Sequence, residues 1–429
     1  MDVLWGIGGM AALIALALLL STNRRAVRWR TVLAALGIQV LFGILVLYWS
    51  WGQRALEQVS QGVQAVINSS NAGIQFVFGP VLPQGEDAGV VFAFQVLPVI
   101  IFFASLTAVL YHFKILQFVV EKLGAALGAA LGTRKAESVN AAANIFVGQT
   151  EAPLVIRPYL KGLTRSGLFA VMVGGLSTVA GSVLVGYSLL GAPLEYLIAA
   201  SFMAAPGALL MAKLVLPEED PEAAERQDRL VSDEPADPEG DKDGDGIPND
   251  EDDLEGMEYR NVIDAAASGA ADGLKLALNI GAMLLAFISL IALVNLLIGT
   301  VGGWFGQPDL TFEQLLGYAF APLMTVIGVP WGEAASAGSF VGQKVIVNEF
   351  VAFSNFAPTI DQFSPKTAAI VTFALTGFAN LGSLGILLGG LGSLVKDRRR
   401  EIAELGIRAV LAATLANLMS AAIAGILIG

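Results

Sequence analysis

The sequence has no cysteine, a single histidine and few charged residues. Without cysteine, the chain can form no disulfide, thiolate metal site or cysteine nucleophile. Charged residues make up 14% of the 429 residues and hydrophobic residues 55%, which is more apolar than an ordinary soluble domain. The histidine, His112, ends an apolar run beside Lys114, as an interfacial residue would, and nothing around it indicates a proton relay. The composition predicts a polytopic, all-α membrane protein.

Eight stretches are long and apolar enough to cross a bilayer as helices, which takes about 20 residues. They lie at residues 3–21, 31–50, 90–112, 167–190, 193–215, 274–301, 366–394 and 405–428. The first starts at Met1 without a basic region or cleavage site, so we expect a retained helix rather than a signal peptide. Residues 51–80 have helical spacing but too many polar groups to span, which predicts an amphipathic helix at the outer surface.

Basic clusters indicate the orientation, because cytoplasmic loops are enriched in Lys and Arg. Such clusters follow the first and seventh spans, at Arg24, Arg25, Arg28, Arg30, Lys396, Arg398, Arg399 and Arg400. If both clusters are cytoplasmic, both termini lie outside.

Two polar segments interrupt the apolar pattern. Residues 144–159 have basic residues before and after them, so we expect a re-entrant hairpin that enters from the cytoplasm and turns near Gly148 and Pro153. Residues 311–353 predict a second hairpin, entering from outside, because an apolar run is interrupted by Pro322, Gly328, Pro330 and Gly332.

The order span, hairpin, interrupted span, span occurs twice and predicts an inverted repeat, a common construction of secondary transporters. We expect four parts. Residues 1–89 hold two spans and the outer interfacial helix, and 90–216 form the first repeat. Residues 217–258 form an acidic cytoplasmic loop, and 259–429 form the second repeat, which begins with an interfacial helix.

Glu151 and Glu349 are the most informative polar residues, because a charge at the bilayer centre costs roughly 2.5–3.5 kcal/mol on insertion scales. Each carboxylate either serves a ligand or pairs with a neighbour for structure alone. Residues 174–187 and 375–394 are rich in Gly and Ser, which indicates either unwound turns with free carbonyls for a cation or close helix packing.

Three motifs, "NIFVGQTEAPLV", "VNEFVAF" and "GFANLGSLGI", resemble signatures of the concentrative nucleoside transporter family in its bacterial, eight-helix form. The resemblance covers nearly the whole chain. It implies a homotrimer in the bacterial inner membrane, in which a mobile transport domain imports nucleosides by alternating access. It also implies symport with sodium, or with protons in some members.

The resemblance also assigns residues. The substrate would contact Gln149, Thr150 and Glu151 with its base, Glu349, Asn380 and Ser383 with its ribose, and Val183 and Phe378 beside them. Sodium would be held by the side chains of Asn144 and Thr178 and the carbonyls of Val147 and Val179. Thr178 stands where Ser is expected in sodium-coupled bacterial members, so proton coupling remains an alternative.

The acidic segment 217–258 is not part of this resemblance. Its "DKDGDGIPNDED" has calcium-loop spacing, with candidate ligands Asp241, Asp243, Asp245, Asn249 and Asp252 and a turn at Gly246. Pro248 and the lack of flanking helical patterns argue against an EF-hand. The composition favours a disordered, solvated chain over a calcium site.

Two other functions remain open. A transporter of another small polar solute would share the same architecture. An intramembrane enzyme could use Glu151 and Glu349 as acid and base, but no metal triad, activated serine or phosphate loop accompanies them. Nothing in the sequence indicates a nucleic-acid partner. The preference between purines and pyrimidines and the ion stoichiometry stay undetermined.

Overall fold

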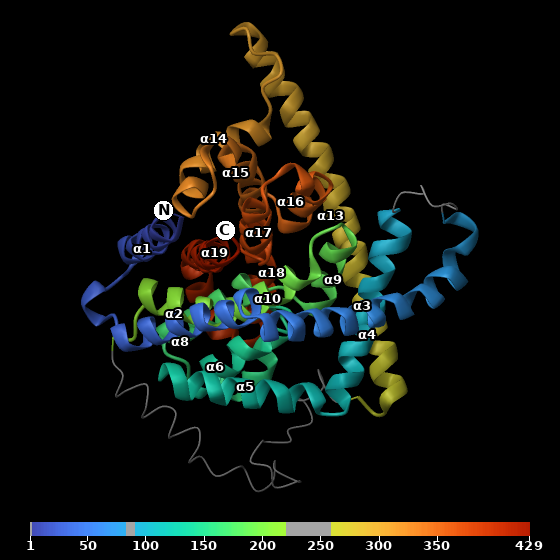
Figure 1. Cartoon of the computed structure of the whole chain (residues 1–429). Coiled ribbons are helices and arrows are strands. Elements are labelled where there is room, and N and C mark those ends of the chain that lie inside the picture. The colour runs from blue at the N-terminus through green and yellow to red at the C-terminus, as the bar shows by residue number, and fades with distance from the viewer. Residues whose placement is uncertain (1, 83–90, 220–258) are drawn as a thin grey trace, which may run out of the picture.

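The computed structural model describes residues 2–82, 91–219 and 259–429, and within these ranges the chain is helical and contains no strand (Figure 1). The predicted all-α membrane fold is confirmed. Seven described helices are long and apolar enough to span a bilayer: 3–20, 29–48, 92–112, 165–189, 194–215, 262–304 and 396–428. The remaining predicted span, 366–394, consists of two shorter apolar helices separated by a break.

The N-terminal part holds three main helices. They are α1 (Asp2–Leu20), α2 (Trp29–Gly43), which continues as the π-helical turn η2 (Ile44–Tyr48), and α3 (Ser50–Phe78). Short 3-10 turns, η1 (Arg24–Ala26) and η3 (Gly79–Val81), flank them. Helix α3 runs crosswise to the neighbouring long helices (Figure 1) and covers the segment expected to be amphipathic.

The middle of the chain begins with the π-helical turn η4 (Phe92–Val96) and α4 (Leu97–His112), followed by α5 (Ile115–Leu131). The first hairpin consists of α6 (Lys135–Ala143), a non-helical turn, η5 (Ala152–Ile156) and α7 (Arg157–Leu160). A broken helix pair, α8 (Arg165–Ser177) and α9 (Gly181–Leu189), leads to α10 (Leu194–Val215).

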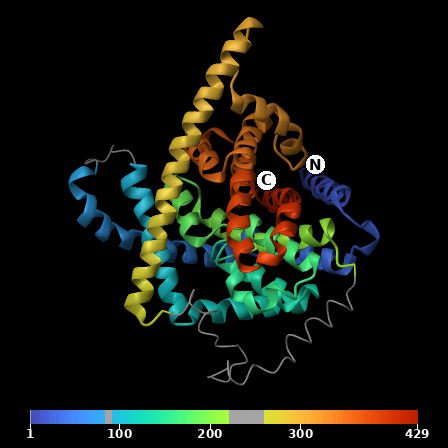
Figure 2. The ribbon, with the colours of Figure 1, turned by 180° about the vertical axis from the view of Figure 1, so that it is seen from behind.

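The C-terminal part repeats this order of elements. It contains α13 (Val262–Trp304), α14 (Phe312–Val326), α15 (Trp331–Ile346), α16 (Glu349–Phe356), η6 (Ala357–Gln362), the broken pair α17 (Pro365–Leu375) and α18 (Leu381–Leu394), η7 (Lys396–Arg398) and α19 (Arg399–Ile428). Helices α4 and α13 lie side by side along one flank of the molecule (Figure 2). Helices α10 and α19 pack together in its interior.

Glycine makes the contact between α4 and α13 close. A Cβ added at Gly273 would lie 2.7 Å from the Cβ of Ala104, and one at Gly269 would lie 2.6 Å from the Cβ of Ala108. Small residues that let helix backbones approach are typical of helix contacts in membranes. The two long helices therefore form a tightly packed wall beside the hairpins.

The second hairpin differs from its predicted form. Residues 311–353 were expected to make one hairpin, but they contain three helices. Helices α14 and α15 are bent by 117° relative to each other, at Gly328 (φ +110°) and Pro330. Two of the four predicted interruptions, Gly328 and Pro330, thus mark this bend, while Pro322 and Gly332 lie inside helices. The turn between α15 and α16 carries Asn348 and Glu349.

Candidate substrate and cation site

A cavity of about 390 Å³ lies where the hairpin turns meet the breaks of the two interrupted helices. Its wall includes all eight residues assigned to the substrate from the sequence: Gln149, Thr150, Glu151, Val183, Glu349, Phe378, Asn380 and Ser383. These residues come from the first hairpin, α9, the start of α16 and the segment that opens α18. The fold therefore brings both carboxylates to one cavity.

One end of the cavity is a fixed hydrogen-bonding group built on two helix starts. Asn348 is the N-cap of α16 and accepts from the amide of Val351 at 2.9 Å, which sets Glu349 in the first turn. Asn380 is the N-cap of α18 and accepts from the amide of Ser383 at 2.6 Å. Its Nδ2 donates to Oε2 of Glu349 at 2.6 Å. These bonds join the second hairpin to the broken helix.

The first hairpin supplies the other end of the cavity. The Glu151 carboxylate lies against Gly148, in space that a Cβ at this position would occupy, so glycine permits the conformation of the turn. Gln149 is 4% exposed, and its Oε1 has no hydrogen-bond partner in the described part of the chain. A buried unpaired acceptor is costly, which indicates a position where a ligand donor binds.

The residues assigned to sodium gather at the base of the same turn. Asn144 is fully buried and caps α6; its Nδ2 donates to the carbonyl of Asn140 at 2.9 Å. Its Oδ1 has no partner among the described residues. Thr178 follows α8, is 1% exposed and donates to the carbonyl of Gly174 at 2.9 Å, which leaves its oxygen able to accept or ligate.

The turn and the break are in direct contact. The amide of Gly181 donates to the carbonyl of Phe146 at 3.0 Å, and a Cβ at Gly175 would lie 2.9 Å from the Cβ of Gln149. Val147 and Val179 are buried within the same segments. An orphaned amide oxygen, a hydroxyl and backbone carbonyls are hard oxygen ligands suited to a small cation.

The breaks of the two interrupted helices cross each other. The amide of Phe378 donates to the carbonyl of Thr178 at 3.1 Å. Asn417 of α19 donates through Nδ2 to the carbonyls of Ser177 at 2.7 Å and Thr376 at 2.9 Å. One side chain thus satisfies free carbonyls from both breaks.

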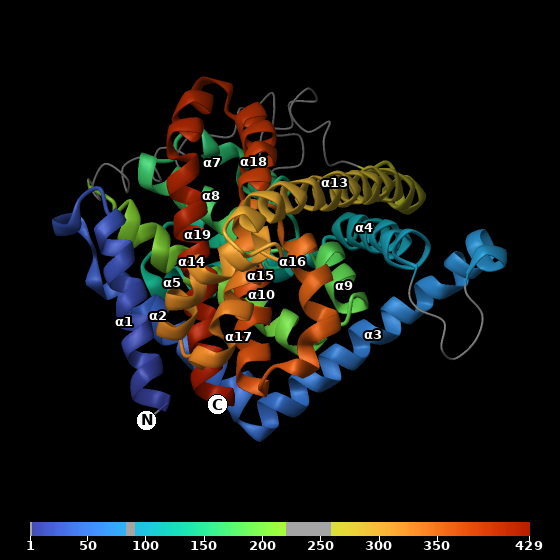
Figure 3. The ribbon, with the colours of Figure 1, turned by 90° about the horizontal axis from the view of Figure 1, so that it is seen from above.

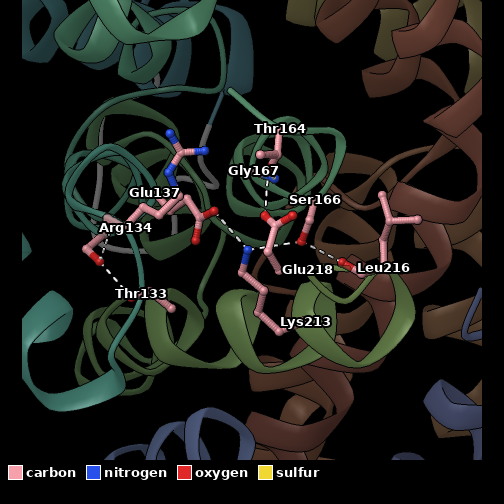
Figure 4. Close-up of polar contacts among 10 residues, drawn as sticks. Thr133, Arg134, Glu137, Thr164, Ser166, Gly167, Lys213, Leu216 and Glu218 are labelled. Carbon is pink, nitrogen blue, oxygen red and sulfur yellow. Dashed lines mark hydrogen bonds and ion pairs between the residues drawn. The ribbon is translucent and has the colours of Figure 1, made fainter. Parts of the chain in front are cut away.

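An ion pair holds the first hairpin to the rest of the bundle (Figure 4). Nζ of Lys213 on α10 donates to Oε1 of Glu137 on α6 at 2.8 Å and to Oγ of Ser166 at 3.0 Å. The Ser166 hydroxyl donates to the carbonyl of Leu216 at 2.7 Å. Both charged side chains are nearly inaccessible, so α6, α8 and α10 are fastened together at this point.

The opposite wall of the cavity was not predicted. It comes from α4 and α13 and includes Thr107, Tyr111, Asp272, Asn279 and Met283. Asn279 lies inside the predicted span 274–301, and an isolated polar residue in a membrane helix is itself a signal of function. The sequence contained this signal for Asn279, but only the packing of α13 on α4 shows that Asn279 faces the hairpins.

Comparison with known proteins places the chain in a family. A family model described as "Na+ dependent nucleoside transporter C-terminus" matches residues 196–425, and its N-terminal counterpart matches residues 8–81. A model described as "Nucleoside recognition" matches residues 93–194. The chain belongs to the sodium-dependent, or concentrative, nucleoside transporter family.

Individual relatives of this transporter agree with that membership. The Bacillus subtilis protein "Uncharacterized transporter YutK" is 53% identical and matches all of both chains. The Helicobacter pylori nucleoside permease NupC is 44% identical over 99% of this chain and 98% of its own. The solved structure of CNTnw in an inward-facing substrate-bound state has a TM-score of 0.89 and 51% identity, and the match covers 100% of this chain and 98% of that one.

These matches decide between the alternatives left by the sequence. The named relatives are transporters and permeases, so the acid–base enzyme is set aside and the chain is a multi-pass membrane transporter. The candidate calcium ligands, 241–252, lie outside the described residues. Nothing in the structure bears on them.

Proposed function

We propose that this transporter imports nucleosides by sodium symport through alternating access of a mobile transport domain, as a homotrimer in the bacterial inner membrane. The carrying observation is that two polar groups from different elements line one cavity. Glu349, Asn380 and Ser383 form one group, and Gln149, Thr150 and Glu151 form the other. A nucleoside has vicinal hydroxyls at one end and a hydrogen-bonding base edge at the other.

The ion is proposed to bind at Asn144, Val147, Thr178 and Val179. This proposal is supported by the unpaired Oδ1 of Asn144 and by the contact between the hairpin turn and the break. A cation there would stiffen the turn that carries Gln149 and Glu151, so ion and nucleoside would favour each other's binding. Binding of either ligand alone would leave the turn less ordered.

The energetic gain of this coupling is sizeable. One sodium ion that enters with a neutral nucleoside gains about 2.3 kcal/mol per 100 mV. Because about 1.4 kcal/mol corresponds to tenfold, the membrane potential alone supports on the order of fiftyfold accumulation. Uptake is then electrogenic, and it carries positive charge inward.

Proteoliposomes with the purified chain test the proposal. Uptake of radiolabelled uridine and adenosine is measured with sodium and proton gradients imposed separately, and with choline replacing sodium as the control. Sodium-driven uptake is the expected result. Uptake that is unchanged in choline and driven by protons would refute the ion assignment, and failure of unlabelled nucleosides to compete would indicate another solute.

A further inference from the structure

Lys344 is a fully buried lysine of the second hairpin that the proposed substrate and sodium sites do not use. It lies near the end of α15 and is 1% exposed. Its Nζ donates to the carbonyl of Ala374 at 2.7 Å and to Oδ1 of Asn417 at 2.7 Å. Both partners are neutral. The charge of Glu349 acts on Lys344, but no carboxylate of the described residues forms an ion pair with it. A buried ammonium in this position is expensive, so its retention calls for a role.

The surroundings of Lys344 differ from those of Lys213, the other lysine that is buried among the described residues. Lys213 is neutralised by Glu137 at 2.8 Å (Figure 4). Lys344 instead donates to the carbonyl of Ala374, which the helix break has left free, and to the side-chain amide oxygen of Asn417. In a continuous helix the carbonyl of Ala374 would accept from the amide of Phe378, four residues on. The amide of Phe378 instead donates to the carbonyl of Thr178 in the other break, and the Lys344 ammonium donates to the carbonyl of Ala374 in its place.

Each of the two repeats thus contains a point at which two helix ends meet. In the first, the end of α6 meets the end of α8, and Asn144 has an unpaired oxygen there. In the second, Lys344 near the end of α15 reaches the end of α17. Helix C-termini carry free carbonyls and a partial negative charge, so each meeting point favours a cation.

We propose that the Lys344 ammonium is a resident cation, which occupies in the second repeat the position that a transported sodium ion takes in the first. The hairpin that carries Glu349 then stays attached to the helix break without an external ion. Only the first repeat depends on sodium, and the transporter couples one sodium ion to each nucleoside. This inference rests on the proposed sodium symport.

Three variants of the full chain test it. Lys344→Ala removes the charge and leaves space, whereas Lys344→Met removes the charge and fills the space. Lys122→Ala, on an exposed part of α5 away from the cavity residues, is the control for loss of one positive charge. Binding of radiolabelled uridine and adenosine to the purified chain is measured against concentrations of sodium, of methylammonium and of choline.

With Lys344→Met we expect nucleoside affinity to fall roughly tenfold or more at every sodium concentration, because two buried acceptors lose their donor. With Lys344→Ala, sodium or methylammonium should restore affinity while choline should not. The sodium dependence of Lys344→Ala should also be steeper than that of the wild type, because two ions now bind. Lys122→Ala should behave as the wild type.

Two results would overturn the inference. The first is wild-type nucleoside affinity and sodium dependence in both Lys344 variants. The second is an equal loss of nucleoside affinity in both variants that no small cation restores, which would show that Lys344 contributes packing alone. If Lys344→Met does not fold, the melting temperature of Lys344→Ala decides instead. Sodium or methylammonium must raise the melting temperature of Lys344→Ala by more than it raises that of the wild type. The methylammonium measurement remains informative even if wild-type uptake proves independent of sodium, which would refute the proposed symport separately.

Discussion

At the scale of single residues, Glu349 is held more firmly than Glu151. It receives a hydrogen bond from Asn380 and is 5% exposed, whereas Glu151 is exposed at the cavity wall. A carboxylate fixed by a neighbouring amide is suited to a constant feature of the ligand. A more accessible one suits a feature that varies between ligands.

Glu349→Gln is therefore expected to weaken binding of every ribonucleoside to a similar extent. A hydrogen bond to a charged group contributes roughly 1.5–3 kcal/mol, so affinity should fall about ten- to a hundredfold and hardly depend on the base. Equilibrium binding of uridine, cytidine and adenosine to the purified variant measures this. A change in base preference without a general loss would mean that the ligand is oriented the other way.

Glu151→Gln and Gln149→Ala are expected to change the ranking of the same three nucleosides. Each base presents a different hydrogen-bonding edge, and in the proposed orientation the unpaired Oε1 of Gln149 would discriminate between donors on that edge. Competition against radiolabelled uridine gives the ranking, with Glu349→Gln as the matched comparison. Equal weakening of all three nucleosides would contradict the role assigned to the first hairpin.

At the scale of elements, the first hairpin depends on an anchor away from its turn. Helix α6 has only nine residues, too short to be stable alone, and the Glu137–Lys213 pair fastens it to α10. Lys213 also donates to the hydroxyl of Ser166 at the start of α8. Tertiary contacts therefore determine where the turn with Gln149 and Glu151 lies.

Lys213→Met is expected to destabilise the protein by about 3–5 kcal/mol, because it leaves a buried carboxylate without its partner. The double variant Glu137→Gln with Lys213→Met should recover much of this loss, since no uncompensated charge remains. Thermal unfolding in detergent measures both variants. A double variant that is no more stable than Lys213→Met alone would show that the charges do not interact as the structure indicates.

At the scale of the whole molecule, elements from distant parts of the sequence meet around the cavity. Both termini lie near each other when the molecule is seen from above (Figure 3), and Trp5 of α1 donates to the carbonyl of Thr325 of α14 at 2.6 Å. The described residues around the cavity include parts of both hairpins, both broken helices, α4 and α13. The acidic segment lies outside both predicted repeats.

Replacing residues 221–254 with a Gly/Ser linker of equal length is therefore expected to leave uptake and nucleoside affinity near those of the wild type. Equal length keeps α10 and α13 joined across the same distance, and such a linker is flexible. Proteoliposome uptake with and without added calcium measures the effect. Loss of affinity in a variant that still assembles, or a calcium effect confined to the wild type, would assign the segment a role.

Local sequence by itself determined the all-α membrane class, the approximate spans and the positions of the breaks. Apolar run length, glycine content and the cost of buried carboxylates act over a few residues and can be read without coordinates. The motifs around Gln149, Glu349 and Asn380 likewise indicated which residues to examine. In contrast, the sequence did not show how the segment 311–353 divides: Gly328 and Pro330 lie where α14 bends against α15, and Asn348 and Glu349 lie in the turn between α15 and α16.

Only the tertiary structure brought the eight candidate residues around one cavity and placed α4 and α13 opposite them. It alone showed the crossing of the two breaks at Phe378 and Thr178 and the bonds of Lys344 to Ala374 and Asn417. These contacts join residues 30 to 200 positions apart. Local periodicity carries no information over such separations, because the partner of a freed carbonyl depends on how distant helices pack.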